Sequence, residues 1–289
     1  MVNKTNPKPA NFSLTGFIQV TRLWNLLIIV MAQYFTAAFL LATERIIFNK
    51  SLFILSLSTV LIAAAGYIIN DYYDVKIDLI NKPKRVVVGR ILKRRVAMVA
   101  HTILNITGIG LGFTLSIKIG LVNFFCALLL WSYSNQLKRM VLIGNLSVAF
   151  LTGLSIYVIA FFFDPDNIMI IAYSLFAFAF TLIREIIKDI EDLKGDATFG
   201  CKTLPVVYGI RKTKNVIYFL SVLFLVLLCW LAFHFIGVEM MFFCLGLVAP
   251  VGFLIYKLAK ADKTIEFNYL SNYCKFVMLI GICSMILFY

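Results

Sequence analysis

The chain has 289 residues, of which 62% are hydrophobic and only 14% are charged, and its mean hydropathy is +0.93. A soluble domain carries about 25% charged residues, so the composition excludes a water-soluble globule and predicts an all-α integral membrane protein. The net charge of +13 does not indicate nucleic-acid binding. The basic residues lie in short loops beside apolar segments, where topology and anionic lipid headgroups account for them.

Apolar segments follow one another along the chain. A helix needs about 20 apolar residues to cross the hydrocarbon layer, and only helices satisfy their own backbone in lipid. We therefore predict one membrane domain over residues 1–289, with a polar stretch at 1–20 and a bundle of nine transmembrane helices. Lys118 and Gly120 indicate a tight turn between the third and the fourth. The predicted helices are residues 23–42, 52–70, 96–117, 121–133, 141–163, 168–187, 216–236, 240–258 and 274–289.

The basic residues predict the orientation of these helices. With nine helices, all Lys and Arg residues except Arg45, Lys50 and Lys118 fall on the side of the N-terminus. The positive-inside rule assigns that side to the cytoplasm. We expect a multi-pass protein of the cell inner membrane with a cytoplasmic N-terminus.

The acidic residues are scarce and clustered. Eight of the 14 lie in two windows, 71–78 and 185–196, at the cytoplasmic ends of the second and sixth predicted helices. Asp71, Asp74 and Asp78 are spaced i, i+3, i+7, and Asp189, Asp192 and Asp196 repeat that spacing. On a helix, this spacing places three carboxylates along one face.

Three carboxylates on one face repel one another, and a divalent cation is the simplest counter-charge. Mg²⁺ uses one or two protein carboxylates together with phosphate oxygens and water, so the spacing indicates a phosphate-bearing substrate. Asn70 adds a neutral oxygen ligand. Two other interpretations stay open. One is a cation-coupled secondary transporter, although transporter sites usually lie near the membrane midplane. The other is a non-catalytic scaffold with solvated acidic loops.

Both acidic motifs, N-D-x-x-D-x-x-x-D and D-x-x-D-x-x-G-D, resemble those of the UbiA-type intramembrane prenyltransferases. Smaller matches cover essentially the whole chain. They are Arg22 with Asn25, Asn81-Lys82-Pro83-Lys84-Arg85 with Gly89, Tyr133 with Lys138-Arg139, and Gly200-Cys201-Lys202-Thr203-Leu204-Pro205. The stretches that begin at Asn70 and Asn81 most resemble the group of geranylgeranylglyceryl phosphate and digeranylgeranylglyceryl phosphate synthase-like enzymes.

The resemblance implies transfer of a prenyl group from a prenyl diphosphate, with Mg²⁺ as cofactor and the site facing the cytoplasm. The acceptor is either an aromatic ring, as in quinone, haem and chlorophyll pathways, or the hydroxyl of a geranylgeranylglyceryl phosphate-type lipid precursor. The implied metal ligands are Asp71, Asp74, Asp78, Asp189, Asp192 and Asp196. The implied catalytic residues are Asp71, Asp74, Asp189, Asp192 and Tyr133. The implied substrate-binding residues are Asn25, Arg22, Asn70, Arg85, Lys138, Arg139, Lys188 and Lys202.

Overall fold

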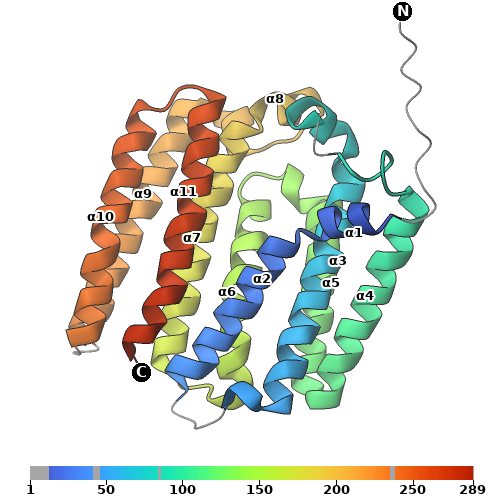
Figure 1. The fold of residues 1–289 in the computed structure, drawn as a ribbon. Helices are drawn as coiled ribbons and strands as arrows, with labels where there is room; N and C mark the ends of the chain where they lie inside the picture. The colour runs from blue at the N-terminus through green and yellow to red at the C-terminus, as the bar shows by residue number, and fades with distance from the viewer. Residues whose placement is uncertain (1–12, 42–45, 84–85, 235–237, 289) are drawn as a thin grey trace, which may run out of the picture. The chain divides into compact units, whose positions relative to one another are not determined.

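The structure is a computed structural model that describes residues 13–41, 46–83, 86–234 and 238–288. Every regular element among the described residues is a helix, and the only extended pairing among them is a single bridge between Val88 and Leu92. In chain order the elements (Figure 1) are α1 (Leu14–Thr21), α2 (Leu23–Phe35), η1 (Thr36–Leu40), η2 (Ile46–Phe48), α3 (Lys50–Asn81), α4 (Arg94–Leu115), α5 (Ile117–Asn135), η4 (Leu137–Arg139), α6 (Ile143–Phe163), α7 (Ile168–Glu191), α8 (Leu193–Thr198), α9 (Leu204–His234), α10 (Val238–Lys260), α11 (Thr264–Cys283) and η5 (Ser284–Phe288).

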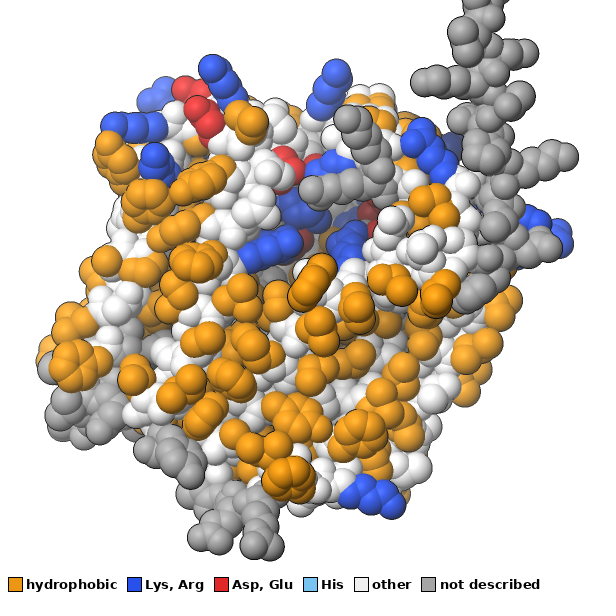
Figure 2. Space-filling model, viewed as in Figure 1, with side chains coloured by type: hydrophobic (Ala, Val, Ile, Leu, Met, Phe, Trp, Pro, Cys, Tyr) orange, Lys and Arg blue, Asp and Glu red, His pale blue; other side chains and the backbone are white. Residues whose placement is uncertain are grey.

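The helices suit a lipid environment. Eight helical stretches among the described residues are long and apolar enough to cross a membrane. The prediction of a multi-span, all-helical protein is therefore confirmed. α10 occupies the place of the eighth predicted helix but is not one of these eight. The count of nine and the cytoplasmic N-terminus stay predictions. Hydrophobic side chains cover most of the helix surface in Figure 2, and charged side chains gather near the turn from α10 to α11.

Two compact units make up the chain. Unit 1 comprises Met1–Ile29 and Ile54–Gln136. Within it α4 packs against α5, and a buried apolar cluster ties α1, α3, α4 and the loop before α4 together. The cluster is Val20, Ile68, Val87, Val88, Leu92 and Ala97. Polar contacts reinforce the packing, since the ring Nδ1 of His101 lies 3.0 Å from the carbonyl oxygen of Ala65.

Unit 2 comprises Val30–Phe53 and Leu137–Tyr289. Its centre is α7, which packs against α6, α9 and α11. Phe176 and Phe180 of α7 meet Phe224 of α9 at ring-centroid distances of 5.9 and 5.3 Å. Such aromatic contacts contribute about 1 kcal/mol each beyond area burial. The hydroxyl of Tyr173 lies 2.8 Å from the hydroxyl of Ser284. The first half of α7 is thus anchored to a packed core.

The observed helix ends differ from the predicted ones where the helices become polar. α3 continues to Asn81 rather than ending at 70. α11 begins at Thr264, where Glu266 accepts hydrogen bonds from the backbone N–H groups of Asp262 and Lys263 at 2.7 and 2.8 Å. The turn before α5 lies at Ser116, whose hydroxyl accepts from the N–H of Ile119, so α5 is a full 19 residues. Hydropathy detects apolar stretches, not the polar turns that extend a helix beyond them.

Candidate active site

The first acidic segment lies entirely on α3. Because α3 runs without a break from Lys50 to Asn81, the i, i+3, i+7 spacing places Asp71, Asp74 and Asp78 along one helical face. All three side chains are half-buried. The local structure here is the one that the spacing predicts.

Arg22 contacts this segment from the junction between α1 and α2. Its backbone has φ 53°, which turns the chain between the two helices. Its Nη2 donates to Oδ1 of Asp71 at 2.8 Å, and its guanidinium lies 5.0 Å from the ring centroid of Tyr67. Burial lowers the pKa of Arg22, but Asp71, Tyr67 and Asp78 together raise that pKa above its ordinary value. The guanidinium is therefore a permanent cation against Asp71.

Two asparagines accompany this ion pair. Asn70 precedes Asp71 on α3, and its Oδ1 is buried with no hydrogen-bond partner among the described residues. A buried oxygen left without a donor is costly, so an oxygen-seeking ligand such as a hard cation suits this position. Asn25 lies in the first turn of α2, half-buried, and its backbone N–H donates to the carbonyl of Arg22 at 2.8 Å.

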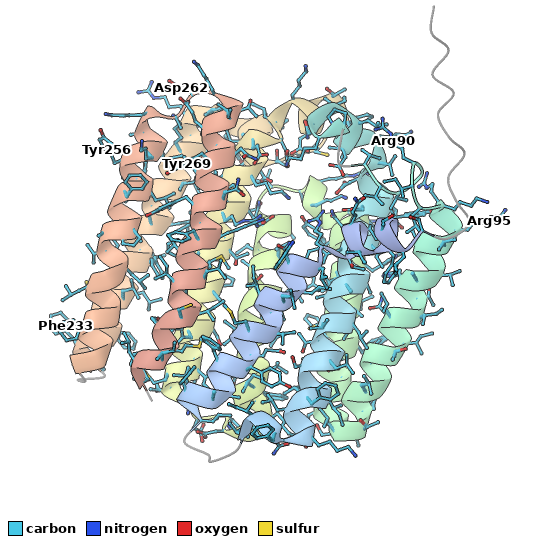
Figure 3. The ribbon with its side chains drawn as sticks, viewed as in Figure 1. Arg90, Arg95, Phe233, Tyr256, Asp262 and Tyr269 are labelled. Carbon is cyan, nitrogen blue, oxygen red and sulfur yellow. The ribbon has the colours of Figure 1, made fainter. Side chains whose placement is uncertain are left out.

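The loop after α3 is ordered by its apolar residues. Val88 is 1% exposed and Leu92 is fully buried. Gly89 has φ 85° between them, a conformation that glycine adopts without strain. Arg90 donates to the carbonyl of Pro83 at 2.7 Å, and Arg90 and Arg95 extend from this end of unit 1 (Figure 3). Arg85, predicted to bind substrate, lies outside the described residues.

The second acidic segment has a different local structure. α7 ends at Glu191, Asp192 has φ −91° and ψ 4°, and α8 begins at Leu193. The carbonyl of Asp192 accepts from the N–H groups of Gly195 and Asp196 at 3.1 and 3.2 Å, which starts the new helix. The prediction that Asp189, Asp192 and Asp196 lie on one continuous helix is therefore wrong, because α7 ends before Asp192 and α8 begins after it.

Buried polar contacts surround Asp189. Asn145 on α6 donates from Nδ2 to Oδ2 of Asp189 at 2.9 Å. One turn earlier on α7, Glu185 pairs with Arg184 and lies 4.0 Å from the Nζ of Lys188. Sequence reasoning missed Asn145, although an amide in a strongly apolar helix was a usable signal. Sequence reasoning also gave Glu185 no role, because only the positions of the two acidic motifs were considered.

Three predicted cationic residues belong to the same unit. Lys138 and Arg139 form η4 just before α6, and the carbonyl of Arg139 accepts from the backbone N–H of Lys202 at 2.8 Å. Gly144 lets η4 pack closely against the start of α6, since a β-carbon there would lie 2.6 Å from the Cα of Lys138. Unit 2 thus joins the loop of Lys138 and Arg139 to the loop of Lys202. Tyr133 is half-buried on α5 in unit 1.

The donor atoms fit a hard divalent cation. No group of three or more His, Cys, Asp or Glu side chains within the described ranges is arranged to hold a metal ion by itself. Mg²⁺ does not require such a cage, because phosphate oxygens and water complete its shell. Carboxylates and the unpaired oxygen of Asn70 are the donor type that Mg²⁺ prefers.

Comparison with known proteins decides the family. The profile of the UbiA prenyltransferase family matches residues 30–269. The chain belongs to this family. It is a membrane prenyltransferase. The family that the two acidic motifs predicted is therefore confirmed.

Individual relatives agree over nearly the full length. The chain is 35% identical to a digeranylgeranylglyceryl phosphate synthase of Saccharolobus solfataricus, over 95% of this chain and 97% of that protein. It is 32% identical to a synthase of the same name from Methanosphaera stadtmanae, over 94% and 98%.

Solved structures share the fold of this prenyltransferase. One, from a structural study of digeranylgeranylglyceryl phosphate synthase, has a TM-score of 0.71 and 25% identity, and covers 94% of this chain and 97% of its own. A UbiA homologue from Archaeoglobus fulgidus bound to GPP and Mg²⁺ has a TM-score of 0.66 and 14% identity, with coverage of 93% and 99%.

Proposed function

We propose that this prenyltransferase adds a geranylgeranyl chain to the free hydroxyl of geranylgeranylglyceryl phosphate, in a magnesium-dependent reaction that forms digeranylgeranylglyceryl phosphate. The observation that carries the proposal is the 35% identity to a synthase of this name over 95% of the chain. A match of that extent includes both acidic segments and the cationic loops, not the fold alone. The prenyl diphosphate donor is supported by the UbiA homologue that binds GPP with Mg²⁺.

The reaction exchanges one carbon–oxygen bond for another. The bond between the first prenyl carbon and the diphosphate oxygen breaks, and its electron pair leaves with the diphosphate. The same carbon bonds to the acceptor hydroxyl oxygen, which loses its proton. Magnesium bound at the acidic segments would neutralise the negative charge on the departing diphosphate. The carboxylates that would hold it are Asp71, Asp74, Asp78, Asp189, Asp192 and Asp196, with Asn70 as a neutral donor.

The chain's own cations would bind phosphate groups. Arg22 and Arg85 suit bidentate contacts with phosphate oxygens, whereas Lys138 and Lys202 act as point charges. Two phosphorylated substrates need more positive charge than one. Arg139 and Lys188 therefore belong to the same proposal, and so does Asn25 as a polar contact.

Exclusion of water is the remaining requirement. An allylic cation formed during departure of the diphosphate reacts with any nearby water, so the reacting carbon must lie among apolar and aromatic side chains. Aromatic faces stabilise cations within about 6 Å. In this proposal Tyr133 supplies such a face, and the substrates enter from the cytoplasmic side of the membrane.

The test is a reconstituted assay. Purified protein in lipid nanodiscs receives labelled geranylgeranyl diphosphate with geranylgeranylglyceryl phosphate or with a hydroxylated aromatic acid, each with Mg²⁺ or with EDTA. We expect the double-chain lipid only with the glyceryl phosphate and Mg²⁺. Product with the aromatic acceptor alone overturns the proposed acceptor. Equal product in EDTA overturns the metal requirement.

A further inference from the structure

Two acidic side chains near the end of α7 each accept a hydrogen bond from an amide of another helix. Asn145 of α6 donates to Asp189, and Asn268 of α11 donates to Oε1 of Glu191, both at 2.9 Å. The two pairs are alike in chemistry and distance. They differ in that Asp189, and not Glu191, is a proposed metal ligand.

Asn145 is built into the unit. Asn145 is only 7% exposed. Water therefore has little access to its side-chain amide, and the hydrogen bond to Asp189 holds the two side chains in one orientation. Its neighbour Gly144 lies against the backbone of Lys138, which fixes the start of α6. A buried polar group in an apolar bundle is costly unless it is bonded. The bond to Asp189 is the contact that offsets the cost.

An amide has a property that a basic side chain lacks. It can orient a carboxylate by donating one hydrogen bond, yet it carries no charge and leaves the carboxylate's negative charge available to a cation. In metal sites, partners of this kind that fix the ligands change metal affinity by about 10- to 100-fold when they are removed. Lys188, the neighbour of Asp189 in the chain, could orient the same carboxylate only by competing with the cation.

We propose that Asn145 is a positioning residue that orients Asp189 for binding of magnesium, an inference that rests on the proposed function. Asn145 uses Oδ2 of Asp189, so Oδ1 of the same carboxylate would be the oxygen that holds magnesium. Asn268 has no such role, because the carboxylate that it orients is not a metal ligand.

The experiment measures metal binding without turnover. Mn²⁺ is titrated into the purified enzyme and the free ion is followed by electron paramagnetic resonance. Asn145→Leu, which keeps the branched shape at Cγ but has no donor, should bind Mn²⁺ about tenfold more weakly than the unaltered protein. Asn268→Leu is the matched control and should bind within twofold of it. In activity assays Asn145→Leu should need about tenfold more Mg²⁺ for half-maximal rate and recover most of its kcat at saturation.

The variant Asp189→Asn distinguishes failure of the positioning role of Asn145 from failure of the metal site. If Asn145→Leu and Asn268→Leu weaken Mn²⁺ binding equally, the effect is structural and the positioning role is overturned. If Asp189→Asn weakens binding but Asn145→Leu does not, only the positioning role is overturned. If Asp189→Asn itself binds Mn²⁺ normally, the proposed metal site fails together with the role of Asn145. Asn145→Ser, which keeps a donor on a shorter side chain, serves as the second variant if Asn145→Leu does not fold.

Discussion

The two acidic segments have the same spacing but different surroundings. Asp71 lies on an unbroken helix and accepts a hydrogen bond from a guanidinium, that of Arg22, at 2.8 Å. Asp189 lies just before a helix break and accepts one from an amide, that of Asn145, at 2.9 Å. A guanidinium compensates the charge of a carboxylate, whereas an amide only orients it. Equal spacing in sequence has therefore produced two sites with different charge balance.

The difference predicts separate tasks for the two segments. In unit 1 the guanidinium of Arg22 already lies beside Asp71. Under the proposed function, this ion pair would have to open or be shared when a metal diphosphate binds. In unit 2 Asp189 is oriented without being neutralised by that contact.

The largest effect should come from removing either carboxylate. Asp71→Asn and Asp189→Asn keep the side-chain shape but remove the charge, and each should lower kcat/KM at least about a hundredfold. Steady-state assays at saturating Mg²⁺ check this. Normal activity in either variant would show that its segment does not take part in the reaction. Glu191→Gln, two residues after Asp189 and outside the proposed metal ligands, is the control.

Much of this architecture was readable from the sequence. The apolar runs predicted membrane helices, and the acid spacing predicted the carboxylate face on α3. The break at Asp192 was not readable, because Asp189 to Asp196 has the same spacing as Asp71 to Asp78, where the helix continues. The pairing of Asn145 with Asp189 was not readable either, since the two residues lie 44 positions apart, although an amide in a strongly apolar helix did mark Asn145 itself.

A second effect concerns the cationic loop of unit 2. In Gly144→Ala the new β-carbon would lie 2.6 Å from the Cα of Lys138, so η4 must move away from α6. Overpacking of this kind costs about 1–3 kcal/mol, and the midpoint of thermal unfolding in detergent should fall. Gly110→Ala is the matched control, because a β-carbon there meets nothing within 4 Å. That variant should be as stable as the unaltered protein or slightly more so.

Asn70 offers a sharper test of unit 1. Its Oδ1 is buried without a hydrogen-bond partner among the described residues, so Asn70→Ala should raise the Mg²⁺ needed for half-maximal rate by about tenfold. Asn105 has an equally buried and unpaired Oδ1 on α4, and Asn105→Ala should leave the Mg²⁺ requirement unchanged. An equal shift in both variants would mean that the unpaired oxygen of Asn70 has no special relation to the metal.

The smallest effect, that of Arg22→Gln, should also be the most informative. It should tighten Mn²⁺ binding, whereas Asn145→Leu should weaken it. Arg22 is half-exposed, so solvent screens its charge in part. Arg22→Gln removes a cation from beside Asp71, and the resting enzyme should bind Mn²⁺ about threefold more tightly. The same variant should raise the KM for prenyl diphosphate, since a guanidinium that can contact phosphate has been lost.

Arg94→Gln is a control from the same unit, because Arg94 lies over the ring of Tyr72 at 4.3 Å rather than on a carboxylate. Weaker Mn²⁺ binding in Arg22→Gln would mean that the arginine orients Asp71 as Asn145 orients Asp189. The guanidinium and the amide would then differ in charge but have the same effect on metal binding.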